Sequence, residues 1–115
     1  MRPVASVLAI AGAALVAAPA TAAAPKPRTV KIADNYYLPA KLTVRPGTTI
    51  KWRWPAEAGD VHDVKLKSGP SGVRKFHSEP ASAGYTFKRT LKKTGRYKIV
   101  CTLHEEMRMT ITVRR

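Results

Sequence analysis

Cysteine occurs only once in the 115 residues, as Cys101. A single cysteine cannot close a disulfide within one chain, which excludes the small secreted scaffolds that depend on internal disulfides. Cys101 is therefore a partner for an intermolecular disulfide, a buried inert thiol or a metal ligand. Aromatic residues are also few, at 7%. They form no stacking series beside a basic helical face, so we do not expect nucleic acid as a partner.

Acidic residues are scarce as well, with 7 Asp and Glu against 21 Lys and Arg and a net charge of +14. A charge of this size favours anionic partners of any kind. The basic residues are scattered through the predicted strands. They predict a solubilising surface with some attraction to anionic surfaces.

Long apolar runs are lacking after the first two dozen residues. The run "VASVLAIAGAALVAA" follows Arg2, and "PATAAAPKP" comes next, where Ala20 and Ala22 form an A-x-A cleavage pattern. This pattern predicts a signal peptide over residues 1–24, a linker over 25–28 and an exported protein, periplasmic or extracellular. An uncleaved membrane anchor is the weaker alternative, because the run is shorter than the roughly 18 to 20 residues that span a bilayer.

Residues 29–115 lack any convincing helix pattern and are predicted to form one all-β domain. Apolar and polar residues alternate there in short runs between prolines and glycines, which is typical of half-buried strands. About seven or eight strands of this kind are most simply buried as a two-sheet sandwich. The predicted strands are 29–34, 41–44, 48–55, 61–70, 85–91, 96–101 and 107–115, with a possible short edge strand around 73–76.

Strand parity predicts which side chains face the core, because successive residues point to opposite faces. Trp52 and Trp54 share the inward face of their strand. In the strand over 61–70, Val64 and Leu66 point inward, whereas Asp63 is expected to point to water.

Four side chains with metal-binding atoms are predicted to meet at one end of this sandwich. The stretch "CTLHEEM" holds Cys101, His104 and Met107, and His62 shares the inward parity of its own strand. Two imidazoles, one thiolate and a thioether are the ligands of blue-copper sites. Zinc suits this set less well, since zinc sites rarely use a thioether.

Two further residues of the same types compete for these roles. Met109 lies on the same face as Met107, and methionines in β cores mostly serve packing. We favour Met107 over Met109 as the thioether ligand, because the length of the loop from Cys101 to Met107 suits such a site. His77 has no partner at a suitable spacing and is expected to be exposed.

The stretches "YYLPAKLTVRPGTTIKW", "GDVHDV" and "GRYKIVCTLHEEM" resemble the cupredoxins, and the gap between His104 and Met107 is similar to that of the amicyanin type. The resemblance implies a Greek-key sandwich that binds one copper ion through His62, Cys101, His104 and Met107. It also implies a single-electron carrier that cycles between Cu(I) and Cu(II) and serves redox protein partners. We expect a monomer and no enzymatic activity, since no catalytic set is apparent.

The chain departs from the cupredoxin pattern at two positions near the predicted site. Trp54 stands where family members commonly have an asparagine that hydrogen-bonds near the thiolate, and Leu103 stands where amicyanin-like loops usually have proline. Both are expected to affect the surroundings of the metal. Glu105 and Glu106 flank the surface histidine, and they favour either a basic docking partner or simply a solvated loop tip.

Two other functions remain open from the residues. The same four ligands would serve a copper sequestration or delivery protein. A metal-free sandwich could instead bind anionic cell-surface polymers through its Lys and Arg side chains.

Overall fold

The computed structural model describes residues 3–4, 12 and 23–115, so the predicted signal peptide lies almost wholly outside the described residues. The described part contains eight strands. Within it, no helix is long and apolar enough to cross a membrane. The all-β prediction is confirmed. The strands are β1 (Arg28–Ala33), β2 (Tyr36–Leu38), β3 (Lys41–Val44), β4 (Thr48–Arg53), β5 (Lys65–Ser68), β6 (Thr86–Leu91), β7 (Gly95–Val100) and β8 (Arg108–Val113).

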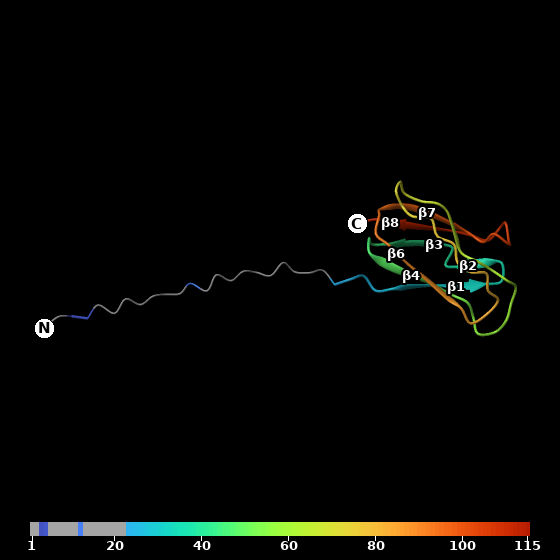
Figure 1. Ribbon diagram of the computed structural model, residues 1–115, viewed down its shortest axis with the longest axis horizontal. Coiled ribbons are helices and arrows are strands. Elements are labelled where there is room, and N and C mark those ends of the chain that lie inside the picture. Colours follow the sequence, from blue (N-terminus) through green and yellow to red (C-terminus); the bar gives the residue numbers. More distant parts are fainter. Residues whose placement is uncertain (1–2, 5–11, 13–22) are drawn as a thin grey trace.

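The strands form two four-stranded sheets that pack as a sandwich (Figure 1). One sheet has the order β2-β1-β4-β6, and the other has the order β3-β8-β7-β5. β1 pairs parallel with β4, and β3 pairs parallel with β8, while the remaining pairs are antiparallel. The chain passes repeatedly from one sheet to the other. The two sheets pack face to face, and their apolar faces form one core.

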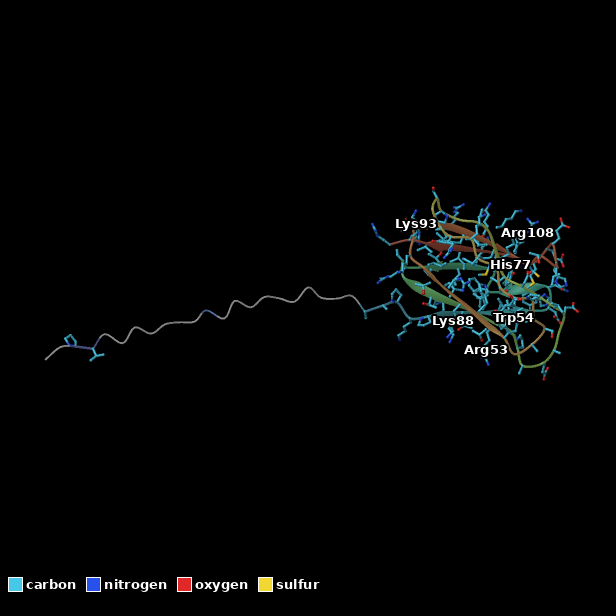
Figure 2. The ribbon with its side chains drawn as sticks, viewed as in Figure 1. Arg53, Trp54, His77, Lys88, Lys93 and Arg108 are labelled. Atoms are coloured by element: carbon cyan, nitrogen blue, oxygen red, sulfur yellow. The ribbon has the colours of Figure 1, made fainter. Side chains whose placement is uncertain are left out.

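The core consists of the inward residues of both sheets, as strand parity predicts. Trp52 is fully buried and Trp54 is 2% exposed. Figure 2 shows Trp54 within the sandwich and Arg53 at its outer face. Trp52 lies against the rings of Phe76 and Phe87, with centroids 6.0 and 5.8 Å away. Tilted rings at these distances stabilise the packing of the core.

Two segments differ from the strand prediction. β2 was not predicted, and it forms because Asn35 turns the chain at φ 70° so that residues 36–38 fold back along β1. The predicted edge strand around 73–76 is wrong. The Phe76 carbonyl accepts one bond from the Leu66 amide and His77 forms one isolated bridge, which is too little for a strand.

The strand directions give the sandwich two distinct ends. We call one the loop end; it carries residues 34–35, 54–64, 76–85 and 101–107. The other is the turn end, with residues 25–27, 45–47, 69–75, 92–94 and 114–115. Hydrogen bonds from Gly47 to Leu91 and from Arg114 to Val44 tie the turn end together. In Figure 1 the approach to β1 and the C-terminus lie at this same end.

Candidate metal centre

The four predicted ligands all lie at the loop end, and three of them are buried. His62 is 2% exposed, Cys101 is 4% exposed and Met107 is fully buried. His104 is the exception, with 22% of its side chain exposed. The inward direction expected for His62, Cys101 and Met107 is therefore confirmed, and so is the loop position of His104.

Backbone hydrogen bonds hold each of these residues in place. His62 exchanges two bonds of 3.0 Å with Ala81, although it lies outside the regular strands. The Cys101 amide donates to the Met107 carbonyl at 3.0 Å, and the Met107 amide donates to the His104 carbonyl at the same distance. The seven-residue loop is thus closed on itself, and its three donor side chains cannot separate without breaking these bonds.

The side-chain donor atoms converge on one point. The Nδ1 atoms of His62 and His104 are 3.1 Å apart, and the Cys101 sulfur lies 3.7 Å from the His104 Nδ1. The ligand atoms of these three residues all lie within 4.8 Å of one another. Ligands bound to one metal ion by bonds of about 2.0 to 2.3 Å sit roughly 3 to 4 Å apart, so the three atoms fit a common ion.

A carboxylate orients the buried imidazole. The Nε2 atom of His62 lies 3.1 Å from Asp34, within hydrogen-bond distance. A proton held on Nε2 by this carboxylate leaves the lone pair on Nδ1, which faces the other donors. The bond from His62 also holds the pKa of Asp34 below its ordinary value. The Nε2 atom of His104 lies 3.8 Å from Asp60, an ion-pair distance that is too long for a hydrogen bond.

Asp63 joins the histidine segment to the cysteine loop. It accepts a 2.7 Å bond from the Thr102 amide and a second bond from the Thr102 hydroxyl. The Nε2 atom of His77 lies 2.8 Å from the same oxygen, Oδ2, that accepts the Thr102 hydroxyl, whereas the amide bond goes to Oδ1. Burial raises the pKa of Asp63, but the bonds from His77 and Thr102 outweigh this, and its pKa is lowered overall. The ionised carboxylate thus fixes the distance between His62 and Cys101.

One expectation about these residues was wrong. Asp63 was expected in water, yet it is 3% exposed, because β5 begins only at Lys65 and strand parity does not extend back to residue 63. His77 is half exposed, as expected, and its contact with Asp63 was not foreseen. The acidic residue directly beside the predicted ligand His62 was the signal that could have revealed the role of Asp63.

The two methionines have different surroundings. The sulfur of Met109 accepts a 3.3 Å bond from the Trp52 indole, inside the core. Met107 is held within the loop by its two backbone bonds and is fully buried. Packing therefore already accounts for Met109, whereas Met107 belongs to the loop that carries the other donors.

The two departures from the family pattern occupy distinct places. Trp54 packs on Tyr85, with centroids 4.8 Å apart, so it is a core residue. Beside the cysteine, the Thr102 amide donates its hydrogen bond to Asp63 and not to a side chain at position 54. Leu103 is 52% exposed and lies at the surface next to His104.

Comparison with known proteins identifies the family. A model of the cupredoxin-like domain matches residues 6–113. Halocyanin from Natronomonas pharaonis is 35% identical over 72 residues, which are 62% of this chain and 42% of halocyanin. The chain thus spans less than half the length of this relative.

Solved structures share the same architecture. A reduced amicyanin variant is 28% identical, with a TM-score of 0.66 over 76% of this chain and 81% of amicyanin. The Cu-containing nitrite reductase from Thermus scotoductus SA-01 is 27% identical, with a TM-score of 0.65 over 87% of this chain but only a quarter of the reductase. Since the family model matches nearly the whole sequence, the chain belongs to the cupredoxin family.

Proposed function

We propose that this protein binds one copper ion through His62, Cys101, His104 and Met107 and carries single electrons between redox proteins. The observation that supports this most strongly is the convergence of the two Nδ1 atoms and the cysteine sulfur within 4.8 Å. Family members bind copper, as in the Cu-containing nitrite reductase and a reduced Cu(I) form of amicyanin.

The donor set suits copper on chemical grounds. A soft thiolate and a thioether favour Cu(I), while imidazole binds both oxidation states. When bound, copper supplies a one-electron couple between Cu(I) and Cu(II). Zinc is disfavoured because a thioether adds little to its binding.

The residues around the donors keep the site rigid and dry. Asp34 orients His62, and Asp63 ties the cysteine loop to the histidine segment. Cys101 and Met107 are buried, which excludes water from the sulfur ligands. A site that cannot rearrange changes little between oxidation states, and this favours fast electron transfer.

The partly exposed ring of His104 is the place where a redox partner would approach. Exposed apolar side chains lie at the same end of the sandwich, namely Tyr36, Leu38, Val61 and Leu103. Acidic side chains surround them, including Asp60 beside His104 and the exposed Glu105 and Glu106. We propose that the partner presents an apolar patch with a basic rim, because complementary charge steers association.

The first test is the visible spectrum of the purified protein after addition of Cu(II). We expect an intense thiolate-to-copper band that ascorbate bleaches and oxidation restores, and Cys101→Ser should abolish it. Met107→Leu should shift the band, whereas the matched change Met109→Leu should leave it in place. A colourless wild-type protein would refute the blue-copper site.

Copper sequestration or delivery is the second candidate, because it needs the same donors. It predicts a tight Cu(I) complex that does not cycle, together with transfer of the ion to an acceptor. Reversible cycling at a defined potential supports the electron carrier, and failure to cycle supports the alternative.

We also propose that residues 1–24 are a signal peptide, residues 25–28 a linker and residues 29–115 the copper domain of an exported monomer. The support is the apolar run with its A-x-A pattern, and β1 begins at Arg28, the last residue of the predicted linker. N-terminal sequencing of the protein recovered outside the cytoplasm should find a start between Ala23 and Pro25. An intact N-terminus at Met1 would contradict cleavage.

A further inference from the structure

Charged residues outside the strands are sorted between the two ends of the sandwich. The connections of the loop end hold all seven acidic residues and no Lys or Arg. The segments of the turn end hold eight basic residues and no acid: Lys26, Arg45, Arg74, Lys75, Lys92, Lys93, Arg114 and Arg115. Twelve further basic residues lie on the strands, so the sorting concerns the connections alone: their positive charge lies at the end opposite the candidate metal centre.

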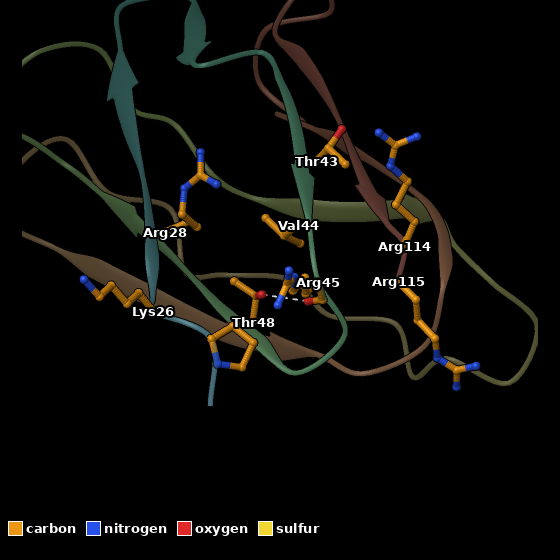
Figure 3. A pocket seen from close by; sticks show the side chains of 9 residues that line it. Lys26, Arg28, Thr43, Val44, Arg45, Thr48, Arg114 and Arg115 are labelled. Carbon is orange, nitrogen blue, oxygen red and sulfur yellow. Dashed lines mark hydrogen bonds between the residues drawn. The ribbon is translucent and has the colours of Figure 1, made fainter. Parts of the chain in front are cut away.

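A cleft of about 500 Å³ opens at the turn end (Figure 3). It lies between the approach to β1, the turn that follows β3 and the C-terminal residues. Five of its lining residues are basic and none is acidic: Lys26, Arg28, Arg45, Arg114 and Arg115. Thr43, Val44, Thr48 and Pro25 complete the lining.

Within residues 23–115, no carboxylate side chain forms an ion pair with any of these five basic side chains. Among residues 23–115, none of them takes part in a side-chain hydrogen bond or an ion pair. Like charges gathered in this way repel one another, and an anion in the cleft would relieve the repulsion. The cleft thus offers free donors and a net attraction for negative charge.

A second basic cleft differs from the first, because several of its basic side chains do contact other groups of the protein. It has a volume of about 620 Å³ and is lined by residues of 72–76 and 89–93. Arg89 covers the Phe87 ring at 4.3 Å, Lys93 donates to the Ser71 carbonyl, and Lys75 donates to the Lys67 carbonyl. Several of its basic groups are therefore already engaged within the protein.

The backbone around the first cleft is firmly held. Thr48 is 2% exposed, and its hydroxyl donates to the Arg45 carbonyl at 2.7 Å. Gly47 has a φ of 90°, which favours glycine, and its amide donates to Leu91 at 2.8 Å. The Arg114 amide donates to the Val44 carbonyl at 3.0 Å. Arg45 and Arg114 therefore project from fixed positions on neighbouring segments.

We propose that this cleft binds a phosphate-bearing anion. The planar guanidinium matches two oxygens of one phosphate, and four of the five basic residues are arginines. The cleft volume exceeds that of a single phosphate, so a diphosphate or a phospholipid headgroup fits the available charge and space. Such a ligand would hold the turn end and leave His104, at the opposite end, open to a redox partner.

The test measures binding of two probes to the full protein without added copper. Sodium pyrophosphate is titrated at constant ionic strength by calorimetry. Vesicles of phosphatidylcholine, with and without phosphatidylglycerol, are used in sedimentation. The cleft variant is Arg45→Gln with Arg114→Gln. Its control is Arg74→Gln with Lys92→Gln, which removes the same charge from the second basic cleft.

We expect the cleft variant to bind the effective probe at least about tenfold more weakly, and the control to stay within about twofold of wild type. Binding of pyrophosphate alone identifies a soluble ligand, and binding to anionic vesicles alone identifies a lipid headgroup. Absence of both, or an equal loss in both variants, overturns the proposal. Because no copper is added, failure of this binding and failure of the proposed copper site are separate results.

Discussion

Replacing Asp63 with alanine is expected to destabilise the protein by releasing the cysteine loop. The carboxylate accepts two bonds from Thr102 and one from His77. A hydrogen bond to a charged group contributes about 1.5 to 3 kcal/mol. Thr102 is exposed and half of the His77 side chain is exposed, so water replaces part of what is lost. We therefore expect a decrease of about 2 to 4 kcal/mol in the free energy of unfolding.

Replacing Asp63 with asparagine gives a sharper comparison. The amide oxygen can still accept from the Thr102 amide, and the NH₂ group can donate to the Thr102 hydroxyl. We expect a loss of about 1 kcal/mol for this change. The lowered pKa of Asp63 means that its stabilisation is present above the ordinary value of 3.8 and is lost as the pH falls through the folded-state pKa. The asparagine variant should lack this acid-dependent part.

Guanidinium unfolding of the copper-free protein measures these effects. The control is Glu106→Ala, an exposed acid of the same loop, which should change the free energy by less than about 0.5 kcal/mol. Equal stability of Asp63→Ala and wild type would refute the idea that this carboxylate holds the loop. An asparagine variant as unstable as the alanine variant would show that charge, and not hydrogen-bond geometry, is decisive.

Three further outcomes are expected. Asp34→Asn should weaken copper binding by about 10- to 100-fold in a chelator competition, because the His62 ring loses its orienting carboxylate, whereas Glu57→Gln should have no effect. Met109→Leu should lower the free energy of unfolding by about 1 to 2 kcal/mol in urea, since the Trp52 indole loses its acceptor, and an unchanged midpoint would contradict this. Burial raises the pKa of Tyr97 above 10.0, so stability should fall as the pH rises past 10 and the unfolded chain ionises, and Tyr97→Phe should reduce this slope in melts between pH 8 and 11.

Most of the fold could be predicted because the strands bury one face. The alternation over 48–55 corresponds to β4, whose buried residues include Ile50 and Trp52. β2 could not be predicted in this way. It has three residues, and its pairing depends on the turn at Asn35 and on the neighbouring β1 strand.

The candidate site was predictable where spacing and parity were sufficient. The loop residues Cys101, His104 and Met107 are close in sequence, and His62 is buried as predicted, although an isolated bridge to Ala81 holds it outside β5. Their role as ligands stays a prediction. Asp34 was beyond reach because it meets His62 across 28 residues of chain, and Asp63 was misplaced because parity was extended past the start of a strand.

The separation of acidic and basic connections between the two ends of the sandwich changes which partners the net charge favours. Along the sequence the acids and bases look scattered, but alternate strands run in opposite directions and bring each connection to one of two ends. A six-residue strand is about 20 Å long, and the Debye length at physiological salt is about 8 Å. A partner at one end is therefore largely screened from the charges of the other. The net +14 predicts anionic partners for the whole molecule, whereas the sorted connections are consistent with the two proposals made above, an anion at the turn end and a basic partner beside His104.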